Sequence, residues 1–305
     1  MNSGSSIRRI FEEKRTIFSV EFFPPKNEEG GKRMIRTATA LQPFKPDFVS
    51  ITYGAGGGTR ETTMRYATIL KEEHGFEVMP HLTCVGHSIY ELMEILEGFA
   101  EAGFRNVMAL RGDPPQGENE FRVTEGGFRY ASDLVALIRE NFPDFGIGVG
   151  GYPEKHPEAP DFETDMTNLK TKIDAGADFI TTQLFFDNQA YFRFVENCKN
   201  AGIQIPIIPG LLPALSLGQV QRFCKMCEAY LPAKLEESLQ NSPRENHPDI
   251  GAKWALNQVS ELLQKNCPGF HLYALNKPES TLAILDGLSR NPQLPGITHL
   301  QKGKL

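Results

Sequence analysis

The chain has 305 residues, a formal net charge of −6 and 40% hydrophobic residues. This acidic balance argues against a general nucleic-acid binder, because such proteins usually present a basic face. No apolar run approaches the ~20 residues that a membrane span needs, and the N-terminus lacks an apolar stretch of the signal-peptide type. Five thinly spread cysteines are typical of a reduced protein, so we expect a cytoplasmic location.

Strand-like apolar runs alternate with amphipathic segments along the chain. We expect strands at about 17–23, 47–53, 77–83, 105–111, 145–151, 178–184, 205–210 and 270–275. Helices are expected at about 28–41, 60–74, 88–102, 129–141, 162–175, 188–201, 216–229, 247–266 and 278–289. The polar segment from Glu236 to Asp249 indicates an extra helix and loop. Eight alternations of strand and helix predict a parallel sheet.

The fold class is therefore α/β. Eight units in about 290 residues fit a single closed (β/α)8 TIM barrel, with a doubly wound open sheet as the alternative. We expect one catalytic barrel domain over residues 1–290 and a loose tail over residues 291–305. In a barrel of this kind, functional residues lie at the C-terminal ends of the strands.

Polar residues gather at seven of the eight predicted strand ends, which predicts a lined pocket. They are Glu21, Thr52–Thr59, His81 with Thr83, Arg111–Asp113, Tyr152, Gln183 and Asn276–Lys277.

Glu21 stands in the stretch "SVEFFPP", near the end of a hydrophobic strand. Strand alternation places it on one face with Ser19 and Phe23, while Val20 and Phe22 take the other face. If the second face meets the helices, Glu21 points into the barrel mouth, where loss of solvation favours the protonated carboxyl group. On spacing alone, a general acid and a structural Glu paired with a basic residue are equally compatible.

Other motifs also leave alternatives open. The run Gly54–Gly58 is a flexible loop or a ligand cradle. Asp113 accepts hydrogen bonds from a ligand or closes a turn. Asp165, Asn168 and Lys172 share one helix face, which binds a ligand or is simply solvated.

Gln183 hydrogen-bonds a heterocycle or is a buried amide. The pair Cys224 and Cys227 is interpreted as helix packing, because structural zinc needs four ligands. No metal, serine-nucleophile or P-loop motif is present, so we expect no bound metal.

An ordered set of motifs is more specific than any one of them. They are "VEFFPP", "TYGAGG", "PHLTC", "ALRGDPP", "YASDL", "YPEKHPEA", "TDMTNLKTKIDAGAD", "TTQLFFD", "IPGLLP" and "LYALNK". Together, from residue 19 to residue 277, they resemble the methylenetetrahydrofolate reductase family. The resemblance implies an FAD-binding (β/α)8 barrel that uses NADH or NADPH to reduce 5,10-methylenetetrahydrofolate to 5-methyltetrahydrofolate, the methyl donor for methionine synthesis. The alternative is a folate-binding barrel that transfers a one-carbon group without redox chemistry.

The resemblance also implies roles for individual residues. Glu21 is the general acid that assists opening of the folate ring at N10, and Asp113 binds the pterin edge and tunes the flavin. Gln183 touches folate and nicotinamide in turn, as a ping-pong sequence requires. The positions that match FAD contacts are Thr52, Tyr53, Ala55, His81, Arg111, Gly112, Asp113, Tyr130, Ala131, Tyr152, His156, Asp165, Asn168, Thr171 and Lys172.

Gln219, Phe223 and Lys277 match positions on the folate side. Two of the matched positions depart from the familiar pattern: Thr171 replaces a basic residue and Lys277 replaces an arginine. Lysine keeps the charge but loses the bidentate fork. We expect a homo-oligomer without nucleic-acid or membrane partners.

Overall fold

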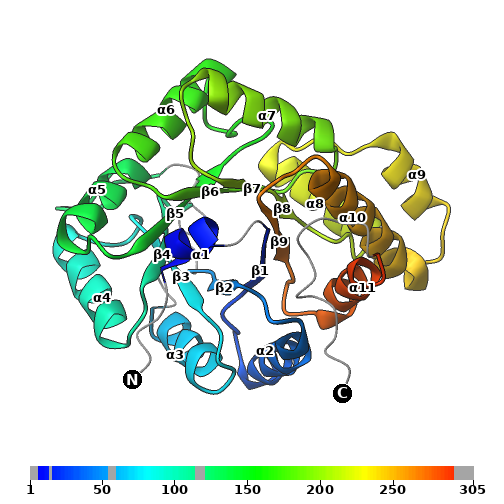
Figure 1. The fold of residues 1–305 in the computed structure, drawn as a ribbon, viewed down its shortest axis with the longest axis horizontal. Coiled ribbons are helices and arrows are strands. Elements are labelled where there is room, and N and C mark those ends of the chain that lie inside the picture. The colour runs from blue at the N-terminus through cyan, green and yellow to red at the C-terminus, as the bar shows by residue number, and fades with distance from the viewer. Residues whose placement is uncertain (1–5, 14–15, 54–59, 114–120, 292–305) are drawn as a thin grey trace.

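A ring of parallel strands forms the centre of this computed structural model (Figure 1). The structure describes residues 6–13, 16–53, 60–113 and 121–291. In these ranges the strands are β1 (Ile17–Phe22), β2 (Phe48–Ile51), β3 (Val78–Thr83), β4 (Asn106–Leu110), β5 (Gly146–Gly151), β6 (Phe179–Thr182), β7 (Ile207–Ile208), β8 (Gly210–Leu211) and β9 (Gly269–Tyr273). Their order in the sheet is β7-β6-β5-β4-β3-β2-β1-β9-β8, and every pair is parallel.

The ring closes through a strand that is interrupted by Pro209. β7 pairs with β6 through Ile207, and β8 pairs with β9 through Gly210. A proline has no N–H to donate to a sheet ladder, but the Pro209 carbonyl still accepts the backbone N–H of His271 at 2.9 Å. The strand predicted at 205–210 is therefore present as two short strands, and the predicted barrel architecture is confirmed.

Helices surround the ring and carry the chain back to the start of each next strand (Figure 1). They are α2 (Glu28–Leu41), α3 (Arg60–Glu72), α4 (Ile89–Glu101), α5 (Ala131–Asn141), α6 (Phe162–Asp174), α7 (Asn188–Asn200), α8 (Leu217–Cys227), α10 (His247–Gln264) and α11 (Pro278–Ser289). All nine correspond to predicted helices. The extra helix expected before the last strand is α9 (Ala233–Gln240), and a 3₁₀ turn (Arg244–Asn246) leads from it towards α10. None of the helices in the described ranges is long and apolar enough to cross a membrane.

The strand alternation predicted for β1 is confirmed by its packing. All six residues of β1 are buried. Val20 and Phe22 belong to the outer core cluster, which also contains Met34 and Ala38 of α2. Glu21 therefore has the opposite orientation, towards the inside of the barrel.

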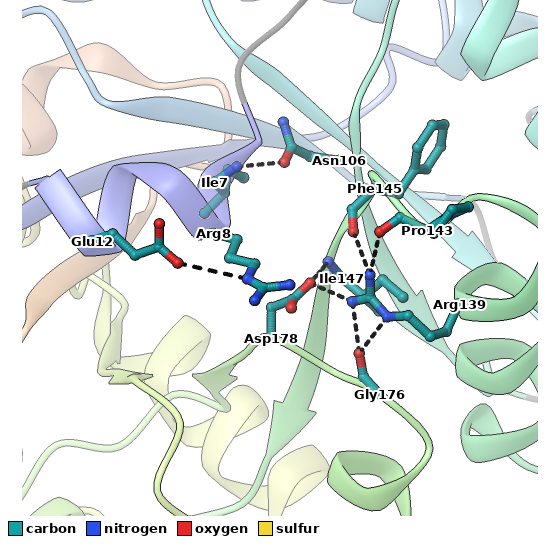
Figure 2. Close-up of polar contacts among 10 residues, drawn as sticks. All are labelled: Ile7, Arg8, Glu12, Asn106, Arg139, Pro143, Phe145, Ile147, Gly176 and Asp178. Carbon is teal, nitrogen blue, oxygen red and sulfur yellow. Dashed lines mark hydrogen bonds and ion pairs between the residues drawn. The ribbon is translucent and has the colours of Figure 1, made fainter.

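A smaller apolar layer fills the barrel interior at the N-terminal ends of the strands. It consists of Ile7, Ile17, Phe48, Met79, Met108, Phe179 and Ile208. Ile7 comes from α1 (Ile7–Glu13), a short helix that the sequence patterns did not predict. The Ile7 backbone N–H donates to Asn106 Oδ1 at 2.7 Å (Figure 2). Because Asn106 is the first residue of β4, α1 covers the N-terminal end of the barrel.

Near the same end, one arginine donates hydrogen bonds to several acceptors (Figure 2). Arg139 of α5 donates to Asp178 Oδ2 at 2.7 Å and to the carbonyl oxygens of Pro143, Phe145 and Gly176. Asp178 also accepts the backbone N–H of Ile147 in β5 at 2.8 Å. These bonds join α5 to β5 and to the loop before β6. Because α1 and the apolar layer fill this end of the barrel, we look for a site at the C-terminal end.

The domain boundaries at 1–290 and the loose tail stay predictions, because residues 292–305 lie outside the described part of the chain.

Candidate active site

Glu21 lies at the centre of the C-terminal half of the barrel interior, and its residue is 7% exposed. Its carboxyl oxygen Oε2 is 3.4 Å from His81 Nε2, 3.6 Å from His271 Nε2, and accepts a 3.4 Å hydrogen bond from Ser50 Oγ. Strand register explains the cluster, because Glu21 pairs with Ser50 on β2 and with Tyr273 on β9. Residues of four strands, β1, β2, β3 and β9, thus meet at one carboxyl group because the ring closes.

Burial favours the neutral form of two neighbours of Glu21, His81 and Tyr273. Burial lowers the pKa of His81, and the charge of Glu21 opposes that effect only in part. Burial also raises the pKa of Tyr273 well above its ordinary range, and its hydroxyl donates to the Thr182 carbonyl at 2.7 Å. A structural ion pair with a lysine or arginine is absent at Glu21 among the described residues. The structure therefore favours a carboxyl group that is available for proton transfer over a salt-bridged strand residue.

The turn after β4 requires a glycine at Gly112. Its φ is +87°, and a Cβ atom there would stand 2.4 Å from Val85 Cγ1 and 2.9 Å from Thr83 Cβ. Such a backbone conformation and such close approach are typical of positions that only glycine fills. The turn directs Arg111 and Asp113 to the barrel mouth, where Asp113 is exposed.

Arg111 is held by Glu158 in a two-pronged ion pair. Its Nη1 and Nη2 atoms each lie 2.5 Å from a Glu158 carboxylate oxygen. These bonds raise the pKa of Arg111 above its ordinary value. The guanidinium group also lies over the ring of Phe121, 4.9 Å from its centroid. Arg111 is therefore a fixed cation at the edge of the site.

The segment after β5 supplies a second group of predicted contacts. The rings of Tyr152 and His156 meet edge to face at 4.5 Å between centroids, and burial lowers the pKa of His156. Asp165 of α6 accepts the His156 backbone N–H at 2.9 Å. Lys172 lies about two turns further along α6. Its Nζ donates to the Gly150 carbonyl at 2.6 Å, and burial lowers the pKa of Lys172 to about 8. Asn168 is exposed on the same helix.

These residues fit a dinucleotide such as FAD. Arg111 follows β4, and Lys172 reaches from α6 to the Gly150 carbonyl of β5; two cations so placed suit a diphosphate. Asn168 and Thr171 are exposed on α6, and Thr171 Oγ1 donates to the Thr167 carbonyl at 3.0 Å. The turn at Gly112 gives a ligand close access to the backbone.

Other predicted FAD positions follow β2 or stand at the start of α5. The Thr52 carbonyl accepts Thr63 Oγ1 at 3.3 Å. Tyr53 is buried, lines a cavity of about 410 Å³ between α3 and α4, and has a pKa raised by burial to about 12. Tyr130 is exposed before α5, and Ala131 is the first residue of that helix. Ala55 lies outside the described residues, as does the predicted cradle over Gly54–Gly58.

The predicted folate-side residues lie on three other segments. Gln183 follows β6, and its Oε1 accepts the Leu184 backbone N–H at 2.9 Å. Gln219 Oε1 accepts the Leu215 backbone N–H at 2.8 Å, just before α8. Phe223 is half-buried on α8, packed against the cluster that contains Val220, and Lys277 is exposed immediately before α11.

Cys224 and Cys227 are free thiols on α8. Both belong to or pack against a small apolar cluster, and burial raises the pKa of each thiol to about 11. This agrees with the interpretation of the pair as helix packing. In the described part of the chain, no group of three or more His, Cys, Asp or Glu residues is placed to hold a metal ion.

Several residues of the site were not singled out from the sequence. Ser19, Ser50 and His271 surround Glu21, and Glu158 holds Arg111. The alternation of β9 places His271 and Tyr273 on one face, which was a usable signal. Their position against Glu21 depends on the pairing of β1 with β9, which no local pattern reveals.

Comparison with known proteins identifies the family. A family model described as methylenetetrahydrofolate reductase matches residues 6–289. The chain is 40% identical over 285 residues to 5,10-methylenetetrahydrofolate reductase of Pectobacterium carotovorum subsp. carotovorum, covering 92% of each protein. It is 39% identical over 278 residues to the Escherichia coli (strain K12) protein of the same name, covering 90% of this chain and 92% of that protein.

A plant relative is longer. Methylenetetrahydrofolate reductase (NADH) 1 of Arabidopsis thaliana is 38% identical over 301 residues, which cover 94% of this chain and 51% of the plant protein. The chain thus spans about half the length of that relative.

Among solved structures, an uncharacterised protein from Clostridium thermocellum that binds two copies of 5-methyl-5,6,7,8-tetrahydrofolic acid matches with a TM-score of 0.63 at 16% identity, over 92% of this chain and 97% of that one. An oxaloacetate acetylhydrolase bound to 3,3-difluorooxalacetate matches with a TM-score of 0.53 at 11% identity, over 94% and 86%. At such identities these likenesses show the fold alone. The family model over residues 6–289 and the bacterial relatives at 39–40% identity go further: the chain belongs to the methylenetetrahydrofolate reductase family, whose reaction is the reduction of 5,10-methylenetetrahydrofolate to 5-methyltetrahydrofolate.

Proposed function

We propose that this chain performs the reaction of its family with FAD as the bound cofactor and NADH or NADPH as the reductant, in a ping-pong sequence. The observation that carries the proposal is the position of Glu21, a buried carboxyl group at the mouth of the barrel with no cationic side chain paired to it among the described residues. A carboxyl group in this position can deliver a proton to a bound substrate.

The proton from Glu21 goes to N10 of the folate. The bond between N10 and the bridging carbon breaks as N10 gains the proton, and the carbon remains on N5 as an iminium ion. The iminium carbon then accepts a hydride and becomes the methyl group. When bound, FAD supplies that hydride after it has been reduced by the nicotinamide.

The residues around the mouth divide between cofactor and substrate. Arg111 and Lys172 would hold the diphosphate of FAD, and the backbone at Gly112 would lie against the flavin. Tyr152, His156, Asp165 and Asn168 form the adjoining wall.

On the substrate side, Asp113 would accept hydrogen bonds from the amino-pyrimidine edge of the pterin. Gln183, Gln219 and Phe223 would contact folate, and Lys277 would meet its glutamate carboxylate. Folate and nicotinamide would use the same space in turn, which is what a ping-pong sequence needs. A homo-oligomer and a cytoplasmic location are further proposals; the five free cysteines support the latter.

The experiment begins with the colour of the purified protein, which should show flavin absorbance from noncovalently bound FAD. Stopped-flow absorbance then follows two half-reactions separately: flavin reduction by the nicotinamide and flavin reoxidation by methylenetetrahydrofolate. Glu21→Gln should leave the first rate nearly unchanged and slow the second by about 10²–10⁴-fold, because only the second needs acid assistance.

Asp113→Asn is the companion variant. It should impair the folate half-reaction more than the nicotinamide half-reaction, because it removes a charge beside both pterin and flavin. A colourless protein that binds no FAD in titration overturns the proposal in favour of one-carbon transfer without redox chemistry. Reoxidation of the Glu21→Gln variant at the native rate removes the role of Glu21.

A further inference from the structure

The two oxygens of the Glu21 carboxyl group have different surroundings. Every hydrogen bond and ion pair that this group makes with a described residue goes to one oxygen, Oε2. Ser50 Oγ donates to it, and two imidazole nitrogens stand 3.4 Å and 3.6 Å away. The other oxygen, Oε1, makes no hydrogen bond or ion pair with a described residue, so we assign the exchangeable proton to it.

His271 is almost completely buried. It is 1% exposed. Its ring is stacked near Phe48 at 6.3 Å between centroids and meets Tyr273 edge to face at 5.2 Å. The two rings fix the plane of the imidazole, so Nε2 points at Glu21 and Nδ1 points at Ser19.

A hydrogen-bond argument fixes the tautomer of His271. Ser19 is fully buried, and among the described residues its hydroxyl contacts one partner, His271 Nδ1, at 2.7 Å. A buried hydroxyl proton without an acceptor is costly, whereas an unused oxygen lone pair costs less. Ser19 Oγ–H therefore donates to Nδ1, which leaves the proton of the neutral ring on Nε2. That N–H faces Glu21 Oε2.

We propose that His271 is a positioning residue for Glu21: Ser19 holds it as an Nε2–H donor that anchors Oε2 and stabilises the carboxylate left after Oε1 has released its proton. The proposal rests on the proposed function, since it assumes that Glu21 is the acid. The distance of 3.6 Å is longer than a hydrogen bond. Contacts of this kind commonly tighten in the reacting complex, here as negative charge develops on Oε2.

The balance of the step is simple. The Oε1 proton passes to N10 as the bond between N10 and carbon breaks, and the electron pair of the O–H bond stays on the carboxylate. His271 and Ser19 exchange no proton with the substrate. Ser19 has no exposure to solvent, so the pair cannot serve as a route for protons from water. Glu21 regains its proton from solvent before the next folate binds.

The pH dependence of the folate half-reaction is the readout, because packing alone would not move it. The titratable groups that face Glu21 are His81 on β3 and both His271 and Tyr273 on β9. Burial lowers the pKa of His81 and raises that of Tyr273, so both stay neutral at mildly alkaline pH. A midpoint that moves between variants in that range is therefore not caused by titration of His81 or Tyr273.

The test compares Ser19→Ala, His271→Gln and His271→Phe with the native holoenzyme, by stopped-flow reoxidation between about pH 6 and pH 9. Loss of the donor weakens the acid, so Ser19→Ala and His271→Phe should move the midpoint upward by about one pH unit and lower the plateau rate about tenfold. His271→Gln keeps an amide N–H donor and should restore part of both. Thr181→Val, which removes another buried barrel hydroxyl, is the matched control and should leave the midpoint in place.

Flavin reduction by the nicotinamide serves as the internal control and should change little in every variant. If the native enzyme reoxidises with folate but the midpoint of Ser19→Ala and His271→Phe stays at the native value, the anchoring role is wrong. A native protein that does not reoxidise with folate at all would instead overturn the proposed function itself. Because Ser19→Ala removes a single oxygen atom, it keeps the test valid if either His271 variant fails to fold.

Discussion

Asn276 and Phe23 are joined by two hydrogen bonds across 253 residues of sequence. Asn276 Oδ1 accepts the Phe23 backbone N–H at 3.0 Å, and Asn276 Nδ2 donates to the Phe23 carbonyl at 2.7 Å. Asn276 adopts a left-handed backbone with φ of +53°, which asparagine tolerates better than most residues. The pair ties the segment after β1, which begins just past Glu21, to the segment that presents Lys277.

Substitution of Asn276 should lower stability, by different amounts in two variants. Asn276→Gly keeps the left-handed conformation and loses both bonds, so we expect a loss of roughly 1–2 kcal/mol in the free energy of unfolding. Asn276→Ala adds the cost of a left-handed alanine, about 1 kcal/mol more. Thermal and urea unfolding of the two variants measure this. Equal stabilities of the Gly and native proteins would show that the two bonds contribute nothing.

Gly112→Ala should damage the turn that leads to Arg111 and Asp113. The new Cβ would overlap Val85 and would also force a left-handed alanine. We expect a loss of about 2–4 kcal/mol in the free energy of unfolding, together with weaker FAD binding, because strain and overlap add. Gly75→Ala is the matched control: Gly75 has φ of +71° but no atom within 4 Å of its Cβ position. A similar loss in both variants would assign the whole effect to backbone strain.

FAD binding should weaken as pH rises above the pKa of Lys172. Burial lowers that pKa to about 8, so the free protein carries the Lys172 charge below this pH and loses it above. A diphosphate favours the charged form, and the dissociation constant should therefore rise above about pH 8, by up to tenfold per pH unit. Flavin fluorescence titrations at several pH values measure it.

Lys172→Met should bind FAD more weakly at pH 7 and lose this pH dependence. Lys170→Met, which removes the cation that pairs with Asp174 on the same helix, is the control and should keep the dependence. The stability of the protein without FAD gives an independent test. Because the folded pKa of Lys172 lies below the unfolded value of about 10.4, native stability should rise between about pH 8 and pH 10 relative to the Met variant. An FAD affinity that is flat across this range in the native protein would refute the phosphate contact.

Lys277→Ala should raise KM for the folate substrate and change kcat much less, because an exposed charge at the rim is remote from the reacting carbon. The expected cost is roughly 1 kcal/mol, or about fivefold in KM. Lys277→Arg should bind as well as the native enzyme or better, through the guanidinium fork. Lys253→Ala, which removes an exposed lysine of α10, is the control. An unchanged KM in Lys277→Ala would show that another residue holds the glutamate tail.

The local patterns of the sequence determined most of the elements and their faces. Alternation along "SVEF" was enough to place Val20 and Phe22 against the helices and Glu21 inside the ring, since side-chain direction in a strand has a period of two whatever the strand pairs with. The starts of α2 and α4 also depend on nearby residues, because Asn27 and Ser88 accept backbone N–H groups of the first turn.

Only the tertiary structure decided what stands next to Glu21. His271 meets Ser19 across 252 residues because β9 pairs with β1 in one register when the ring closes. Ring closure also decides two other features: the interruption of the seventh strand at Pro209, and the position of α1 at the N-terminal end of the barrel. The seven residues of α1 carry too weak a pattern to predict a helix, and its apolar side chains find partners only inside the assembled ring. Local conformation depends on neighbouring residues, whereas contacts between distant strands depend on register and closure, which the whole chain fixes together.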